Sequence, residues 1–333
     1  MPSAQYSNRI VWADWIKVVL ISLVIMGHTG SSLIPVIYTF HIPAFFFVSG
    51  YLSNYEKPIK HLLKTSLLLA GAIVIWNIIF VACNIPDGVK GADLHKIWLF
   101  VRNSLIKTFW CYYPTSKWGH GLLCQMWFVW VLIIIKLACG LIARRGERLK
   151  LGVILACVVY TAIVYHNDVR TWFYLDRSIC ALPFFLAGNM ARGMKIDVDK
   201  LSSIRNIAIA AAMMTICVVV TLKTYDRSID MFHFRLGRNA ILYYTTAAIG
   251  TALCIMICTK LPRAKAIEIL SNGTLLILAI HIWLYQYLDE YFIFDKTRIT
   301  ETLAIVLICL PLVYITEKWC PILLGKNKHT KKK

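Results

Sequence analysis

The sequence predicts an all-α membrane protein, a bundle of about ten transmembrane helices. Hydrophobic residues make up 59% of the 333 residues and charged residues only 16%, whereas about a quarter of an ordinary soluble domain is charged. The mean hydropathy is +0.64. Apolar runs approaching the roughly 20 residues that cross a bilayer recur between short polar, Gly or Pro breaks. We therefore expect one membrane-embedded domain over residues 1–333.

The apolar runs divide the chain into ten predicted helical spans. Several of them are short for a bilayer of about 30 Å. Between the third and fourth spans, residues 84–121 are expected to form a long extracytoplasmic loop, and residues 317–333 to form a basic cytoplasmic tail. The predicted spans are 10–28, 33–52, 63–83, 122–143, 150–165, 177–192, 205–222, 239–258, 267–288 and 301–319.

The formal net charge of +19 raises the question of a nucleic-acid partner. Here, however, Lys and Arg gather in short loops between the spans and in the C-terminal KNKHTKKK. That distribution follows the positive-inside rule, and attraction to anionic lipid reinforces it. It predicts a multi-pass protein of the cell (inner or plasma) membrane with both termini in the cytoplasm. The lipid bilayer is the expected partner, and nucleic acid is not.

The eleven cysteines mostly stand singly within apolar runs, where they behave as small hydrophobic residues. No CxxC pair occurs, and Cys254 and Cys258 share a span without ligand-type neighbours. We therefore expect neither a metal site nor a disulfide framework. Cys111 and Cys124, at the long loop, are the one pair that would merit a test.

Four ionisable residues stand in the first two apolar spans: Asp14, Lys17, His28 and His41. Ionisable groups inside hydrocarbon are costly, so each is a candidate functional residue. Lys17 and His28 are eleven residues apart, almost three helical turns, so they share a helix face about 16 Å apart along its axis. Asp14 lies one turn before Lys17 and can pair with it. The first helix therefore carries a polar stripe between its two ends.

Histidine is the side chain best suited to removing a proton from a hydroxyl near neutral pH. This makes His28 a candidate general base and leaves Lys17 to contact a polar or anionic ligand. Each residue also has a plainer interpretation. Lys17 can be a snorkelling residue at the inner interface, and His28 can be a hydrogen-bonded residue at a helix end. Their shared face favours function.

The long loop is rich in aromatic residues around KTFWCYYPTSKWGHG, which includes Trp118. One interpretation is an aromatic belt at the membrane interface. The other is a stacking surface for a sugar ring, since Trp and Tyr offer an apolar face and a polar edge. The two interpretations are compatible.

Four motifs resemble the acyltransferase-3 superfamily of membrane acyltransferases. Lys17-x10-His28 resembles its basic-residue-x10-His motif on the first helix, although arginine is the commoner basic residue there. The run FHIPAFFFVSGY over Phe40–Tyr51 resembles the family's F-H-x-P-x-F-F-F-x-S-G-Y/F segment. Met126–Val129 resembles its W-F-L motif at the start of a later span, and Ser271–His281 its S-x-x-x-Y-L-x-H segment. The sugar O-acetylases within the superfamily look most similar.

The resemblance implies transfer of an acyl group, acetyl from acetyl-CoA, to a hydroxyl of an extracytoplasmic or lipid-linked glycan, without a metal. It implies that His28 is the general base, that Lys17 holds the donor and that Asp14 orients Lys17. His41, Trp118 and Trp127 are then the expected substrate-binding residues. Lys57, Lys60 and Lys64 follow the second span on the predicted inner face, where family members place basic residues against the CoA phosphates, and Lys60 and Lys64 are the expected CoA contacts. Positive-inside anchoring is an equally good interpretation of each lysine alone.

No role is carried over to His281, because its segment lacks the family's tyrosine and a histidine of an apolar helix is more often a satisfied core residue. Two functions other than catalysis remain open at this point. A transporter would use the same polar stripe as a substrate or proton path, and a sensor would bind a ligand without chemistry. The Pro43–Gly50 run is faintly echoed at Pro183–Gly188, as repeats in transporters are. We interpret the echo as packing.

Overall fold

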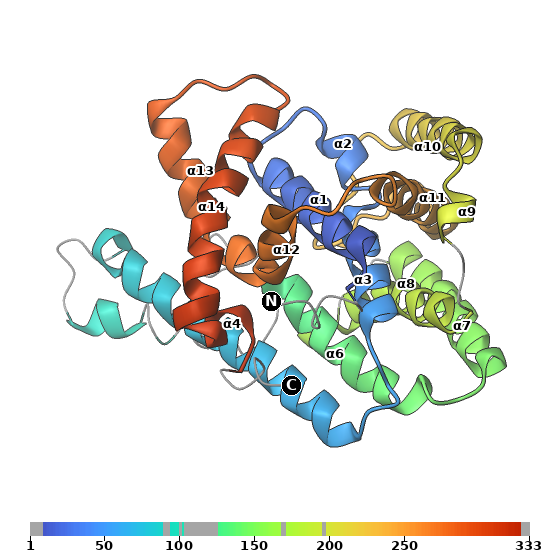
Figure 1. The fold of residues 1–333 in the computed structure, drawn as a ribbon, viewed down its shortest axis with the longest axis horizontal. Helices are drawn as coiled ribbons and strands as arrows, with labels where there is room; N and C mark the ends of the chain where they lie inside the picture. The colour runs from blue at the N-terminus through green and yellow to red at the C-terminus, as the bar shows by residue number, and fades with distance from the viewer. Residues whose placement is uncertain are drawn as a thin grey trace, which may run out of the picture. The chain divides into compact units, whose positions relative to one another are not determined.

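The computed structural model describes residues 9–88, 94–99, 102, 126–167, 171–194 and 198–327. These residues form helices, joined by turns and one isolated bridge between Asp230 and Arg235 (Figure 1). The all-α prediction is confirmed. The principal helices are α1 (Val11–His28), α2 (Ile34–Ile37), α3 (His41–Leu52), α4 (Ile59–Gly88), α6 (Trp127–Ile142), α7 (Glu147–His166), α8 (Leu175–Gly193), α9 (Val198–Leu201), α10 (Ile204–Thr224), α11 (Ala240–Cys258), α12 (Lys265–Asn272), α13 (Thr274–Tyr291) and α14 (Ile299–Trp319).

Each of the ten predicted spans coincides with helix over its described residues, and two of them consist of two helices each. The span predicted over 33–52 consists of α2 and α3. The span predicted over 267–288 is the pair α12 and α13, bent by 84° at Gly273. Within the described part of the chain, seven helices are long and apolar enough to cross a membrane, with α2 and α3 counted together as Ile34–Leu52, or up to eight if the bent pair counts as one span. The 16-residue α6 is shorter, and α8 carries the charged residues Asp176, Arg177 and Arg192.

Chain contacts divide the protein into two compact units, and the expectation of one domain stays a prediction. The first unit contains residues 1–53 and 184–314. Within it, α1 packs against α3, α11, α12 and α13, and α11 packs against α3 and α10. The apolar side chains of α1 supply much of the core, with Ile16, Leu20 and Ile25 fully buried. This packing fixes the helix that carries the predicted polar stripe.

The second unit contains residues 54–183 and 315–333, with α4 packed against α6. Arg144 ties the end of α6 to the loop before α4, donating to the carbonyl oxygens of Tyr55 at 2.9 Å and Lys57 at 2.8 Å. The predicted tail begins inside α14 and continues as a 3-10 turn, Pro321–Leu324, where the Leu323 carbonyl accepts a hydrogen bond from Trp76 Nε1 at 2.9 Å. Residues 317–324 are therefore folded rather than a free tail, and residues 328–333 lie outside the described residues.

The predicted loop over 84–121 begins later than expected, because α4 continues to Gly88. Residues 94–99 are helical. Trp118, the aromatic stretch around it, Cys111 and Cys124 lie outside the described residues, so the sugar-stacking prediction and the cysteine pair stay predictions.

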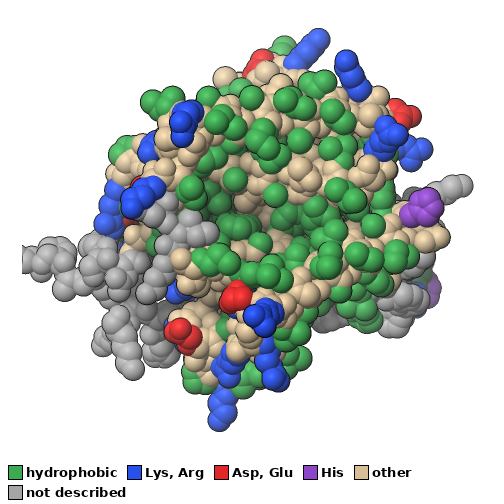
Figure 2. Space-filling model, turned by 90° about the vertical axis from the view of Figure 1, so that its right-hand side faces the viewer, with side chains coloured by type: hydrophobic (Ala, Val, Ile, Leu, Met, Phe, Trp, Pro, Cys, Tyr) green, Lys and Arg blue, Asp and Glu red, His purple; other side chains and the backbone are tan. Residues whose placement is uncertain are grey.

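Apolar side chains project outward from several helices, as a lipid-facing surface requires. On α10, Ile204 is 86% exposed, and Ile209, Ile216 and Leu222 are also exposed. Figure 2 shows hydrophobic side chains spread over the middle of the face that it displays, with Lys and Arg toward its margin. A surface of this kind is typical of a protein that sits in a bilayer.

Candidate active site

His28 is the last residue of α1, at the point where the chain turns toward α2. Gly27 lets the ring of Tyr38 approach, because a Cβ on Gly27 would lie 2.5 Å from Tyr38 Cε1. The Tyr38 hydroxyl donates to the Gly27 carbonyl at 3.0 Å. Gly30 takes a φ of +77°, which favours glycine. The Gly-His-Thr-Gly sequence thus ends the helix and presents His28 next to a close interhelical contact.

The His28 side chain is exposed, although its neighbours Gly27 and Thr29 are buried. It makes no hydrogen bond with any residue that the structure describes, and its ring lies against the ring of His281. Both ring nitrogens of His28 are therefore available to a ligand. A candidate general base needs this freedom, because it must reach the proton that it removes.

His41 opens α3 and is buried, with 6% of its surface exposed. Its Nδ1 lies 2.8 Å from the Ile37 carbonyl oxygen. Because a carbonyl only accepts, Nδ1 carries the hydrogen and Nε2 keeps the lone pair. The ring also contacts Tyr38 at 5.1 Å between centres. Tyr38 therefore joins the segment that holds His41 to the helix end that holds His28.

His281, in the middle of α13, is fully buried, and its ring centre lies 5.1 Å from that of His28 at a tilt of 48°. Its Nδ1 donates to the carbonyl oxygens of Ile277 at 3.1 Å and Leu278 at 2.9 Å. Its Nε2 has no hydrogen-bond partner among the described residues. The expectation of a satisfied core histidine is therefore wrong for Nε2. The sequence feature that could have identified His281 as a site residue was its position at the end of the Ser271–His281 motif.

Asp230 is a residue that the sequence reasoning missed. It lies in the turn between α10 and α11, and its charge acts on His28, Tyr38 and His41. Its Oδ1 accepts from the backbone N–H of Phe232 at 2.9 Å, and its Oδ2 pairs with Nδ1 of His233. The only sequence signal was an Asp-x-x-His spacing in a polar connection between two spans.

The pKa of Asp230 reflects two opposing effects. Burial would raise it, but the hydrogen bond and charge of His233, together with the backbone N–H groups of His233 and Phe232, hold the pKa below its ordinary value of 3.8. Asp230 is therefore a carboxylate at neutral pH and places a negative charge near the His28 end of α1.

At the other end of α1, Asp14 is buried and binds three partners. It accepts from Arg9 at 2.5 Å and 3.0 Å and from Ser271 Oγ at 2.5 Å, and Lys17 Nζ lies 4.0 Å away. Lys17 instead donates to the Ser271 carbonyl at 3.1 Å. Asp14 and Lys17 therefore both bind Ser271 near the C-terminal end of α12, just before the bend at Gly273. A cation there also complements the negative end of that helix's dipole.

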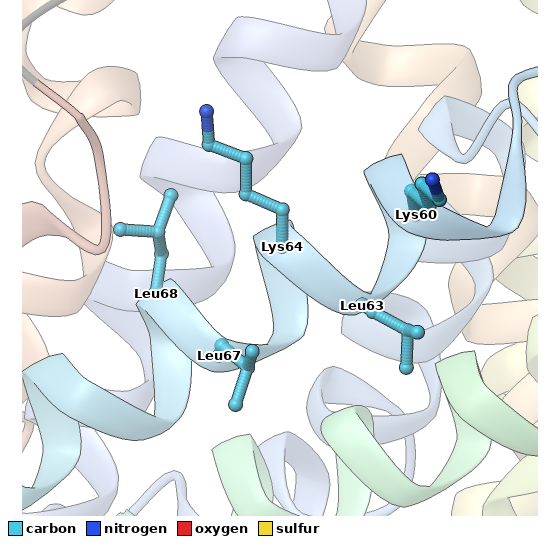
Figure 3. Close-up of a pocket in the computed structure, with 5 residues that line it drawn as sticks. All are labelled: Lys60, Leu63, Lys64, Leu67 and Leu68. Carbon is cyan, nitrogen blue, oxygen red and sulfur yellow. The ribbon is translucent and has the colours of Figure 1, made fainter.

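The remaining predicted residues belong to the second unit. Trp127 begins α6, is 8% exposed and contacts Tyr174 edge to face at 6.4 Å. Lys60 and Lys64 are exposed on the first turns of α4. They line an open cavity of about 430 Å³ together with Leu63, Leu67 and Leu68 (Figure 3). Figure 3 shows Lys64 and Leu68 extending to one side of α4 and Leu63 and Leu67 to the other, so lysine and leucine side chains line the cavity together.

No group of three or more His, Cys, Asp or Glu side chains is placed to hold a metal ion within the described ranges. The described side chains of the candidate site can transfer protons through histidines, accept hydrogen bonds through a carboxylate and bind anions through lysines. Two of the histidines have a fixed tautomer with a free Nε2 lone pair, and His28 is open to a ligand.

These features define a class: a polytopic α-helical membrane protein whose first helix ends in an accessible histidine, with two further histidines beside it. The comparison with protein families gives the particular family. The acyltransferase-3 model, described as an acyltransferase domain, matches residues 10–318, and the chain belongs to this family of membrane acyltransferases. No curated protein and no solved structure matches the chain.

Proposed function

We propose that this acyltransferase moves an acetyl group from cytoplasmic acetyl-CoA to a hydroxyl of an extracytoplasmic or lipid-linked glycan. The observation that carries the proposal is His28, which is exposed and without a hydrogen bond to any described residue at the end of a buried helix. With both termini in the cytoplasm, as the charge pattern predicts, His28 lies at the outer end of α1 and Lys17 nearer the inner one.

His28 acts as the general base in the proposed reaction. The acceptor O–H gives its proton to His28 as the oxygen attacks the thioester carbon. An O–C bond forms, the C–S bond breaks, and the proton passes to the thiolate to release CoA. Positioned proton transfer of this kind contributes about 10²–10⁴-fold to the rate. A second route, through acyl on a His28 nitrogen, uses the same atoms in two steps.

Lys17, Lys60 and Lys64 support the donor side of the proposal. Lys60 and Lys64 place two cations beside leucines on the open cavity of α4, which suits the phosphates and the apolar arm of CoA. Lys17, held near the bend between α12 and α13, is the candidate contact for the donor along α1, with Asp14 beside it.

His41 and Asp230 support the acceptor side. The lone pair on His41 Nε2 and the Asp230 carboxylate accept hydrogen bonds, and sugar hydroxyls donate them. Trp118 and Trp127 remain the candidates for stacking on a sugar ring, although Trp127 is already buried against Tyr174.

The test is transfer of label from radioactive acetyl-CoA to the glycan fraction of membranes that contain the protein. His28→Ala should lower the transfer rate at least about 100-fold. His166→Ala is the matched control, because His166 is also an exposed histidine that ends a helix. Normal transfer by a well-expressed His28→Ala variant would contradict the proposal. Uptake of label into vesicles without transfer to glycan would instead indicate a transporter.

A further inference from the structure

The unpartnered Nε2 of His281 needs an explanation that packing does not supply. The residue is fully buried, and its Nδ1 is held by the Ile277 and Leu278 carbonyl groups. Those bonds fix the hydrogen on Nδ1 and leave a lone pair on Nε2. Buried polar atoms are nearly always paired, so a buried acceptor without a donor among the described residues marks a place where a donor is expected.

His28 is the residue placed to supply that donor. The ring centres of His28 and His281 lie 5.1 Å apart, a separation at which two imidazoles can share one N–H···N bond of about 2.9 Å. The rings are tilted by 48°, and no such bond is formed in the present orientation. Rotation of the exposed His28 ring about its Cβ–Cγ bond would align them, and that torsion has a broad energy minimum.

We propose that His281 is a positioning residue whose Nε2 accepts a hydrogen bond from a ring N–H of His28. The proposal rests on the proposed function of His28 as general base. With one nitrogen of His28 donating to His281, its other nitrogen must carry the lone pair, and that nitrogen faces the acceptor hydroxyl. No bond is made or broken at His281 itself.

The proposed contact has a second consequence once His28 takes the proton. The positively charged ring then needs an acceptor for its second N–H, and His281 Nε2 is already in place. A buried carboxylate does this work in many hydrolases. A neutral histidine does it here without adding a charge to a fully buried site.

Two variants separate positioning from folding. His281→Leu removes the acceptor, and His281→Gln keeps a side-chain oxygen that can accept from His28. With labelled acetyl-CoA and glycan-bearing membranes, we expect His281→Leu to lower kcat at least about tenfold, by analogy with the loss seen when the partner that orients a metal-ligating histidine is removed. The KM for acetyl-CoA should not change. His281→Gln should keep kcat within about threefold of the unaltered protein.

A second measurement does not depend on activity. In protein labelled with ¹⁵N-histidine, the His28 ring, assigned with His28→Gln, should show a single tautomer that becomes a mixture in His281→Leu. Identical His28 ring signals in both proteins would overturn the proposal, as would equal losses of kcat in the Leu and Gln variants. If the unaltered protein transfers no label, the proposed function fails, and the ring signals still decide whether the His28–His281 contact exists.

Discussion

Gly50 of α3 lies directly against the backbone of Phe185 in α8, so a Cβ on Gly50 would stand 1.9 Å from the Phe185 carbonyl oxygen. The relationship is reciprocal, because a Cβ on Gly188 would stand 2.0 Å from the Phe47 carbonyl oxygen. These glycines end the two similar runs that begin at Pro43 and Pro183. The interpretation of that echo as packing is confirmed. Small residues at such crossings let transmembrane helices approach backbone to backbone.

Adding a methyl group at this crossing should destabilise the protein. We expect Gly50→Ala or Gly188→Ala to cost about 1–3 kcal/mol, because backbone atoms cannot move aside as a flexible side chain can. The measurement is the thermal unfolding temperature of the detergent-solubilised protein. Because α3 carries His41, activity should fall as well.

Gly71→Ala in α4 is the matched control, since a Cβ there meets nothing within 4 Å. Alanine favours the helix over glycine by up to about 1 kcal/mol, so this variant should be as stable as the unaltered protein or slightly more so. Equal stability of the Gly50→Ala and Gly71→Ala variants would contradict the close approach of α3 and α8.

Asp14 should matter for stability as well as for any role beside Lys17. Asp14→Asn removes the charge that Arg9 and Ser271 bind. Since Arg9 is partly exposed, we expect a loss of about 2 kcal/mol, less than the 3–5 kcal/mol of a fully buried pair. Ser271→Ala, which removes one donor, should cost about 1 kcal/mol. Chemical unfolding of both variants measures the difference, and a Ser271→Ala variant less stable than Asp14→Asn would reverse the assignment.

Asp230 should make the stability of the folded protein decrease as the pH falls below about 5. A carboxylate whose pKa is lower in the folded protein contributes stability that is fully present above its unfolded pKa of about 3.9. That stability is lost as the pH falls through the folded pKa. Between pH 5 and pH 3, the unfolding temperature of the unaltered protein should therefore fall more steeply than that of Asp230→Asn.

The control for this titration is Asp226→Asn, an exposed carboxyl in the same connection between α10 and α11. It should keep the steep acid dependence of the unaltered protein. If the unfolding temperatures of Asp226→Asn and Asp230→Asn fall equally steeply with pH, the contact with His233 does not keep the pKa of Asp230 low.

Lys64 should contribute to donor binding through its charge. We expect Lys64→Ala to raise the KM for acetyl-CoA about fivefold at low salt, because a Lys beside an anionic group contributes about 1 kcal/mol. kcat should stay the same, and the effect should shrink at high salt. Lys260→Ala removes another exposed lysine from the predicted inner side. An equal rise of KM in that variant would point to general attraction rather than a site on α4.

The helices were predictable because burial in lipid demands long apolar runs, and such runs are visible one residue at a time. The geometry of the breaks was not. The Asn272-Gly273 pair is a sequence signal for a turn, but the 84° angle of the bend depends on packing, since a Cβ on Gly273 would meet Val313 at 2.2 Å. The end of α4 was misplaced by five residues, because the helix continues past Cys83 into polar sequence, to Gly88.

Some residues of the candidate site were likewise predictable from the sequence and others were not. His28, Lys17 and His41 stand out in the sequence because a polar group in an apolar span is rare. Asp230 does not, because an acidic residue in a connection between spans is ordinary. His281 was visible but was assigned to the core, since the sequence does not show which of its two nitrogens finds a partner.

The sequence alone determined the membrane class, the helical content, the family motifs and the choice of His28, because each depends on composition or spacing along one helix. Only the tertiary structure showed that the ring of His281 contacts that of His28 and that the charge of Asp230 acts at the same end of α1. It also decided that Asp14 binds Ser271 rather than Lys17 alone. The physical reason is that these contacts join residues more than 200 positions apart, and only the packing of α1 against distant helices brings them within hydrogen-bonding or electrostatic range.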